Sequence, residues 1–339
     1  MKNNLFRNLV IFHGITLISI LTALGMYGYI GTFNRLMGDS LCSYYFAQRL
    51  GLLRSIWYWR LIWSGRYSAY AFDWVLSSIL SSKNVPIFIP VVLVVWIAIN
   101  TVAFFLILKK LSNDKNSLFF SLLLGSASVF IILETSPYIQ QSFYWIDGFR
   151  AYTLPVIALP LSFIICLLII ENPKIPTAVV ACISFLMAFA NGGLSETFAA
   201  FQFAFLILCI TSYLIIEKSI KINKTLLSLI SGLIGSVVAL TVVITAPGNA
   251  VRQQFFPDPP GIVKLISISL YSFSSFWQTI FTTPEKIMGL IGVILLSIWI
   301  GNIIQIDTKA QNLEKKNRLK PCLSVVIIFC LLSTRSLWI

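Results

Sequence analysis

The chain has 339 residues, of which 58% are hydrophobic and 11% charged, and its formal net charge is +13. An ordinary soluble domain carries about 25% charged residues, so this composition excludes a soluble globular protein. The basic residues lie in short blocks between apolar runs, which is typical of membrane-topology signals and argues against nucleic-acid binding.

Nine apolar runs, most of them roughly 17–25 residues long, predict an all-α polytopic membrane protein with about nine transmembrane helices. The predicted spans are 9–30, 86–108, 117–134, 151–170, 176–190, 197–216, 226–246, 287–306 and 323–339. The first run exceeds the ~7–15 residue core of a signal peptide and has no cleavage motif after it, so we interpret it as a retained helix. The chain ends inside the last run. We therefore expect a single transmembrane domain, 1–339, that is truncated at its C-terminus.

Lysines set the predicted orientation. With the N-terminus inside, every short cytoplasmic connection carries lysine, as the positive-inside rule requires, whereas most arginines fall on the outer side. The outer-face loops are then 33–85, 135–150, 191–196 and 247–286. This orientation requires that the apolar stretch 67–80 makes no crossing and lies along the outer surface.

The first outer loop is predicted to contain amphipathic juxtamembrane helices. From 40 to 64, Phe46, Leu50, Leu53, Trp57 and Leu61 recur at helical spacing, which describes a helix with its apolar face in the membrane interface. The segment 262–282, after a proline-rich turn, is expected to lie on the same surface.

Asp39 is the first candidate catalytic residue. It follows the first span in Gly38-Asp39, where a carboxylate suits a general base at the membrane surface. The alternative is that Asp39 is the N-cap of the next helix.

Glu196 is the second candidate. It lies in a tight turn between two spans, beside Gly192-Gly193, and an ionisable group at such a depth is by default a functional hypothesis. It could bind sugar hydroxyls or share acid–base work with Asp39. Alternatively, it favours a helix N-terminus through its charge.

Further outer residues are candidates for binding a substrate or a lipid phosphate. Arginine offers a planar fork of donors suited to phosphate, and aromatic rings can stack on a sugar, although both residue types also populate membrane interfaces. These candidates are Arg66, Arg150, Arg252, Asn249, Tyr144, Trp145 and Asp147.

Several of these features resemble the GT-C class of integral membrane glycosyltransferases: an acidic residue after the first span, juxtamembrane helices and many further spans. Short motifs resemble more narrowly a bacterial polytopic family grouped with O-antigen and lipopolysaccharide glucosyltransferases. The motifs are Gly38-Asp39, Trp63-Ser64-Gly65-Arg66, Ser195-Glu196-Thr197 and Ala246-Pro247-Gly248-Asn249-Ala250-Val251-Arg252. Ser195 replaces the asparagine that usually precedes the glutamate of that family.

The resemblance implies a bacterial inner-membrane enzyme that moves a sugar from a polyprenyl-phosphate donor to a surface glycan or lipid-linked acceptor on the extracytoplasmic face. Asp39 would be the base, and Arg66, Arg150 and Arg252 would hold the leaving phosphate. No histidine or carboxylate cluster has metal-ligand spacing, so neither a metal nor another cofactor is expected.

Two other functions remain open. An O-antigen polymerase would depend mainly on arginines in large outer loops. A transporter or flippase would place ionisable residues near the membrane midplane, in broken helices.

Overall fold

The computed structural model of the chain describes residues 2–80, 83–111, 116–136, 138–217, 223–258 and 260–284, together with residues 287 and 291. Every regular element within these residues is helical. Seven helices match the first seven predicted spans: α1 (Lys2–Gly31), α5 (Val85–Leu111), α6 (Ser117–Thr135), α7 (Ile146–Glu171), α8 (Thr177–Gly192), α9 (Glu196–Glu217) and α10 (Lys224–Ile244). The remaining helices are α2 (Asp39–Leu50), α3 (Leu52–Ile62), α4 (Tyr67–Ile79), α11 (Gly248–Gln253) and α12 (Ile262–Thr282), with a π-helical turn η1 (Gln140–Tyr144) before α7.

Six of the described helices are long and apolar enough to cross a membrane, and α8 is apolar but shorter. In such a segment the backbone hydrogen bonds are satisfied within the helix itself, which is what a lipid environment demands. The predicted all-helical, multi-pass class is therefore confirmed. The predicted spans 287–306 and 323–339 lie outside the described residues, apart from residues 287 and 291, and stay predictions.

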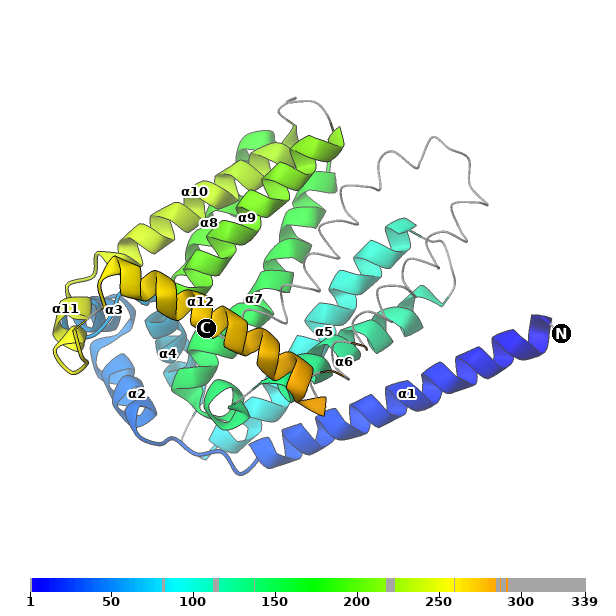
Figure 1. Cartoon of the computed structure of the whole chain (residues 1–339), viewed down its shortest axis with the longest axis horizontal. Coiled ribbons are helices and arrows are strands. Elements are labelled where there is room, and N and C mark those ends of the chain that lie inside the picture. Colours follow the sequence, from blue (N-terminus) through cyan, green and yellow to red (C-terminus); the bar gives the residue numbers. More distant parts are fainter. Residues whose placement is uncertain are drawn as a thin grey trace.

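The long helices run beside one another as a bundle, and the short helices α2, α3, α4 and α11 gather at one end of it (Figure 1). α1 runs along the edge of the bundle and carries the N-terminus away from these short helices (Figure 1). Short helices are thus present in the first predicted outer loop, whereas α12, the predicted segment 262–282, runs from α11 across the bundle (Figure 1).

Two kinds of packing hold the bundle together. Between α1, α5, α6 and α7, large side chains such as Trp96, Phe143 and Phe149 form an apolar cluster and are almost fully buried. Between α8 and α10, small residues let the backbones approach: a Cβ added at Gly235 would lie 2.5 Å from the Phe185 carbonyl oxygen. Close approach of this kind is typical of helix pairs in membranes.

The amphipathic segment 40–64 was predicted as one helix, and this prediction is wrong. Gly51 separates α2 from α3 with a φ of 75° and a ψ of 177°, a conformation that is essentially restricted to glycine. The chain therefore turns at Gly51, and α2 and α3 both pack on α4.

The stretch 67–80 forms α4, which has 13 residues and is shorter than the roughly 17 needed for a span. It does not simply lie along a surface, because Tyr70 and Asp73 on it are buried. The loop predicted at 135–150 is also shorter than expected: α7 begins at Ile146, so Asp147 and Arg150 belong to its first turns.

Lys109, Lys110, Lys174 and Lys224 lie at the opposite end of the bundle from Arg66, Arg150 and Arg252. α7 has 26 residues and is about 39 Å long at 1.5 Å per residue. Arg150 lies near its first residue, whereas Glu171 at its end pairs with Lys110 of α5. At that same end, Lys224 Nζ donates to the carbonyl oxygens of Asn172 and Ile175. We call this the lysine end and the opposite one, with the short helices, the arginine end.

Candidate functional site

The arginine end contains two arginine–carboxylate clusters on elements that are far apart in the sequence. The first, the Glu196 cluster, consists of Glu196, Arg66 and Arg252. The second, the Arg150 cluster, consists of Arg150, Asp73 and Asp147. The sequence-predicted candidates Asp147, Arg66, Arg150, Arg252 and Glu196 are thus all found in one or the other.

In the Glu196 cluster, two guanidinium groups share one carboxylate. Arg66 Nε lies 2.7 Å from Glu196 Oε2, and Arg252 Nη1 lies 3.4 Å from Oε1. The three side chains retain 25–30% of their exposure. Two positive charges against one negative charge leave the cluster with a net charge of +1, at a position that a ligand can reach.

Glycines allow the segments of this cluster to meet. Arg66 lies in the link between α3 and α4, Glu196 is the first residue of α9, and Arg252 is on α11. A Cβ added at Gly65 would lie 2.6 Å from the Val243 carbonyl oxygen, and one at Gly193 would overlap the Tyr67 ring. In the Gly-Gly turn noted in the sequence, Gly193 therefore serves close packing against α4.

The Arg150 cluster is buried. Arg150 Nη2 lies 2.5 Å from Asp147 Oδ1, and Nη1 contacts Asp73 Oδ2, with side-chain exposures of 11%, 8% and 6% for Arg150, Asp147 and Asp73. The Arg150 guanidinium also lies over the Tyr70 ring, 5.2 Å from its centroid. Because a buried charge is tolerated when it is paired, these contacts explain how an arginine is accommodated between α4 and α7.

The same cluster fixes the beginning of α2. Ser40 Oγ donates to Asp147 Oδ2 at 2.5 Å, and Ser43 Oγ donates to Oδ1 at 3.4 Å. Both serines are buried. The first turn of α2 is therefore attached to the first turn of α7, immediately beside Asp39.

Asp39 is exposed and is the first residue of α2. Gly38, with a φ of 55°, is the N-cap, so the interpretation of Asp39 as the N-cap is wrong. Asp39 interacts electrostatically with both Asp147 and Arg150, but no hydrogen bond or ion pair to its carboxylate is found among the described residues. Among the described carboxylates beside the Arg150 cluster, Asp39 is thus the one that is left open to a ligand.

A buried tyrosine lies between the two clusters. The hydroxyl of Tyr70 shares a 2.8 Å hydrogen bond with the Ser64 hydroxyl. Tyr70 also interacts electrostatically with Arg150, Arg66 and Glu196. Burial raises the pKa of Tyr70 above its usual value of 10.0. Tyr70 is therefore neutral at pH 7 and separates the two groups of charges.

The other predicted binding residues have local partners. Asn249 Nδ2 donates to the carbonyl oxygens of Val243 and Ile244, and so caps the end of α10. The Tyr144 hydroxyl donates to the Tyr27 carbonyl oxygen at 3.1 Å, and burial raises the pKa of Tyr144 to about 12. Trp145 is the N-cap residue of α7 and is half-buried. Tyr144 and Asn249 thus connect helices, and neither is a member of the two clusters.

Sequence reasoning missed Asp73, Ser40 and Tyr70 as parts of the site. Asp73 did carry a signal, because a lone carboxylate in an apolar stretch needs a partner when it is buried. Ser40 and Tyr70 carried no such signal, since serine and tyrosine are common in membrane interfaces. The carboxylates of both clusters form ion pairs with guanidinium groups. Within the described residues, no group of three or more His, Cys, Asp or Glu side chains is placed to hold a metal ion.

No protein-family model matches this sequence, and neither the curated protein sequences nor the solved structures contain a match. The length and composition of the helices define a multi-pass helical membrane protein. Its distinguishing feature is a polar, arginine-rich site at one end of the bundle.

Proposed function

We propose that the chain is a membrane glycosyltransferase of the GT-C kind. It would move a sugar from a polyprenyl-phosphate donor to a surface glycan or lipid-linked acceptor, on the extracytoplasmic face of the bacterial inner membrane. The observation that carries the proposal is the presence, at one end of the bundle, of an exposed carboxylate, Asp39, and two accessible arginines, Arg66 and Arg252.

In the proposed reaction, Asp39 takes the proton of the acceptor hydroxyl as this oxygen bonds to the anomeric carbon of the sugar. The bond from the anomeric carbon to the phosphate oxygen breaks at the same time, and the polyprenyl phosphate leaves. Its developing negative charge needs positive charge that is already in place. Arg66 and Arg252 supply that charge in the form of guanidinium groups, which bind phosphate well.

Two roles expected from the sequence change in this proposal. Both oxygens of Glu196 face guanidinium groups, so we assign Glu196 to orienting Arg66 and Arg252 and not to acid–base chemistry. Arg150 is buried between two carboxylates. We therefore assign it, with Asp147, to positioning the start of α2 and hence Asp39.

The distribution of lysines supports the proposed sidedness. Lys109, Lys110, Lys174 and Lys224 lie at the ends of α5, α7 and α10 that are remote from Asp39. The positive-inside rule places such lysines in the cytoplasm. The arginine end would then face the extracytoplasmic side, where polyprenyl-linked sugars are used by enzymes of this kind.

The test compares the surface glycans of strains that carry the intact gene, Asp39→Asn or Asp258→Asn. Asp258 is an exposed carboxylate of the segment after α11, so its substitution removes the same charge outside the clusters. We expect Asp39→Asn to lower transfer by about 100-fold or more, in the range of a general base, and Asp258→Asn to leave the glycan unchanged. An unchanged glycan with Asp39→Asn, at normal protein level, would refute the role of Asp39.

The same assay separates the alternatives. Arg252→Gln is compared with Arg54→Gln, since Arg54 is exposed on α3 and not a member of either cluster. If Arg252→Gln shortened the surface glycan chains while Asp39→Asn left the glycans normal, the result would favour a polymerase. For a transporter or flippase, purified protein would show no sugar transfer from a synthetic polyprenyl-phosphate sugar.

A further inference from the structure

A cavity of about 690 Å³ lies inside the bundle, between α5 on one side and α7, α8, α9 and α10 on the other. None of its lining residues belongs to the two arginine–carboxylate clusters. Its volume falls in the range of about 300–1,000 Å³ that is typical of small-molecule sites. The cavity is therefore a second site, separate from the one at the arginine end.

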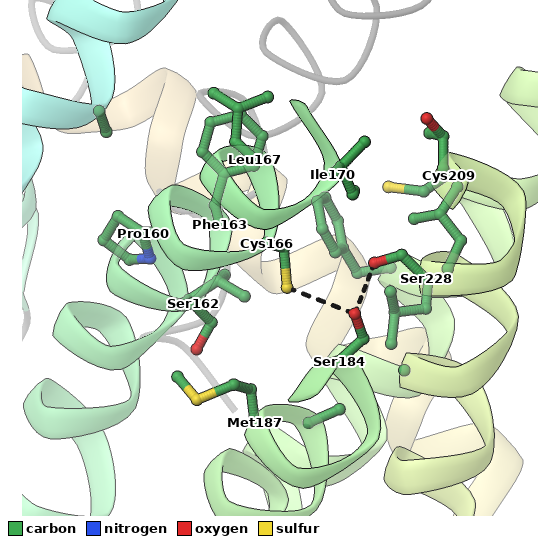
Figure 2. A pocket seen from close by; sticks show the side chains of 18 of the residues that line it. Pro160, Ser162, Phe163, Cys166, Leu167, Ile170, Ser184, Met187, Cys209 and Ser228 are labelled. Atoms are coloured by element: carbon green, nitrogen blue, oxygen red, sulfur yellow. Dashed lines mark hydrogen bonds between the residues drawn. The ribbon is translucent and has the colours of Figure 1, made fainter. Parts of the chain in front are cut away.

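The wall of the cavity is suited to an apolar ligand. Phe163, Leu167, Ile170 and Met187 line it, and polar side chains are interspersed among them (Figure 2).

Several of these polar groups have hydrogen-bond partners within the protein. Ser184 Oγ lies 2.6 Å from Ser228 Oγ and 3.7 Å from Cys166 Sγ (Figure 2). Deeper in the bundle, Asn191 Nδ2 donates to Ser162 Oγ, and Gln202 Nε2 donates to the Ala188 carbonyl oxygen. Since these donors already have partners, a hydrocarbon chain in the cavity would leave none of them unpaired.

The cavity opens at the lysine end. Its lining residues Lys110, Glu171 and Glu217 are exposed, whereas Asn191 and Gln202 at the other limit are buried. From Gln202 to Glu217 on α9 the distance is about 22 Å at 1.5 Å per residue. Half of a bilayer hydrocarbon core is about 15 Å thick, so the cavity is deep enough for a lipid tail of the leaflet at that end.

We propose that the cavity binds one acyl chain of a phospholipid from the leaflet at the lysine end. At the mouth, Lys110 and Glu171 form an ion pair with each other, and Glu217 adds a second carboxylate. A zwitterionic headgroup adds no net charge beside this pair, and its amine can face Glu217. The expected ligand is therefore a phosphatidylethanolamine. The site does not depend on the proposed transferase reaction.

The first experiment fills the cavity from Gly232, which lines it. A Cβ added at Gly232 meets Leu206 at 3.6 Å, an ordinary contact, so a larger side chain extends into the space without displacing backbone. Gly25→Leu is the matched control, because nothing lies within 4 Å of a Cβ added at Gly25 of α1.

The full chain is reconstituted in nanodiscs of palmitoyl-oleoyl phosphatidylethanolamine or phosphatidylglycerol and extracted in mild detergent. Native mass spectrometry then measures the lipid that remains bound to the protein. We expect the wild type and Gly25→Leu to retain one phosphatidylethanolamine, and Gly232→Leu to retain about tenfold less, as a loss of 1.4 kcal/mol in binding would give. Equal retention by Gly232→Leu and Gly25→Leu would overturn the proposal. Equal retention of the two lipids would overturn the choice of headgroup.

The second experiment uses the wild type alone, so it stands even if Gly232→Leu does not fold. A phosphatidylethanolamine with a diazirine at the end of one acyl chain is photolysed in the nanodisc. We expect labelled peptides from the deep wall of the cavity, in particular at Met187, Phe205 and Leu206. Labelling confined to exposed side chains on the outside of the bundle, as on α1, would mean that the cavity holds no lipid.

Discussion

At the scale of single residues, Arg150 is the residue on which the architecture of the arginine end most depends. It neutralises part of the charge of Asp73 and Asp147 in a buried position. Removal of one partner from a buried ion pair costs about 3–5 kcal/mol, because the remaining charge has no compensation. We expect Arg150→Met to lower the free energy of unfolding by that amount, measured as a lower melting temperature of the purified protein by circular dichroism.

Arg54→Met is the control for this prediction. Arg54 is exposed on α3, and surface substitutions of this kind usually change stability by no more than about 0.5 kcal/mol. If the Arg150→Met and Arg54→Met proteins melted at the same temperature, the buried cluster would not be the attachment between α2, α4 and α7 that we describe.

Part of the site was predictable from the sequence at this scale. The lysine pattern assigned Asp39, Glu196, Arg66 and Arg252 to one side, and the structure brings all four to one end of the bundle. The pairing of Arg150 with Asp73 was not predictable. It depends on α4 packing against α7, which no local spacing encodes.

At the scale of secondary-structure elements, the turn at Gly51 determines where α2 and α3 lie. No atom lies within 4 Å of a Cβ added at Gly51, so the strain of a substitution comes from its φ of +75° alone. A non-glycine residue in such a region costs about 1–3 kcal/mol. We expect Gly51→Ala to lower the melting temperature accordingly.

Gly25→Ala provides the comparison for Gly51→Ala. It also places a Cβ in open space, but inside α1, where alanine is favoured over glycine by roughly 0.5–1 kcal/mol. The two substitutions should therefore change the melting temperature in opposite directions. A stabilising effect of Gly51→Ala would show that the break between α2 and α3 is not required.

The same position explains why the sequence predicted one helix where there are two. The apolar residues Phe46, Leu50, Leu53 and Trp57 keep helical spacing across Gly51, so their periodicity gives no sign of a turn. The long spans were predictable because each is an uninterrupted apolar run, whose length alone indicates a helix. The start of α7 was predicted too late, because the polar groups of Asp147 and Arg150 look like a loop when their partners are unknown.

At the scale of the whole molecule, the proposed reaction requires that the arginine end face the extracytoplasmic side, which is the orientation that the positive-inside rule predicts from the lysines. A native cysteine tests it directly. Cys42 is exposed on α2, at the arginine end. Cys182 is also exposed, but in the apolar helix α8, where a lipid environment would keep a membrane-impermeant maleimide away from it.

We expect a membrane-impermeant maleimide to label Cys42 in right-side-out membrane vesicles without lysis. The signal is the difference between the wild type and Cys42→Ser, which removes any contribution of other cysteines. In the Cys42→Ser background, Lys174→Cys reports on the exposed lysine end and should be labelled only after lysis. Protection of Cys42 until lysis would place Asp39 on the cytoplasmic side. The transferase proposal would then be untenable, because its lipid-linked donor and its acceptor would lie across the membrane from the base.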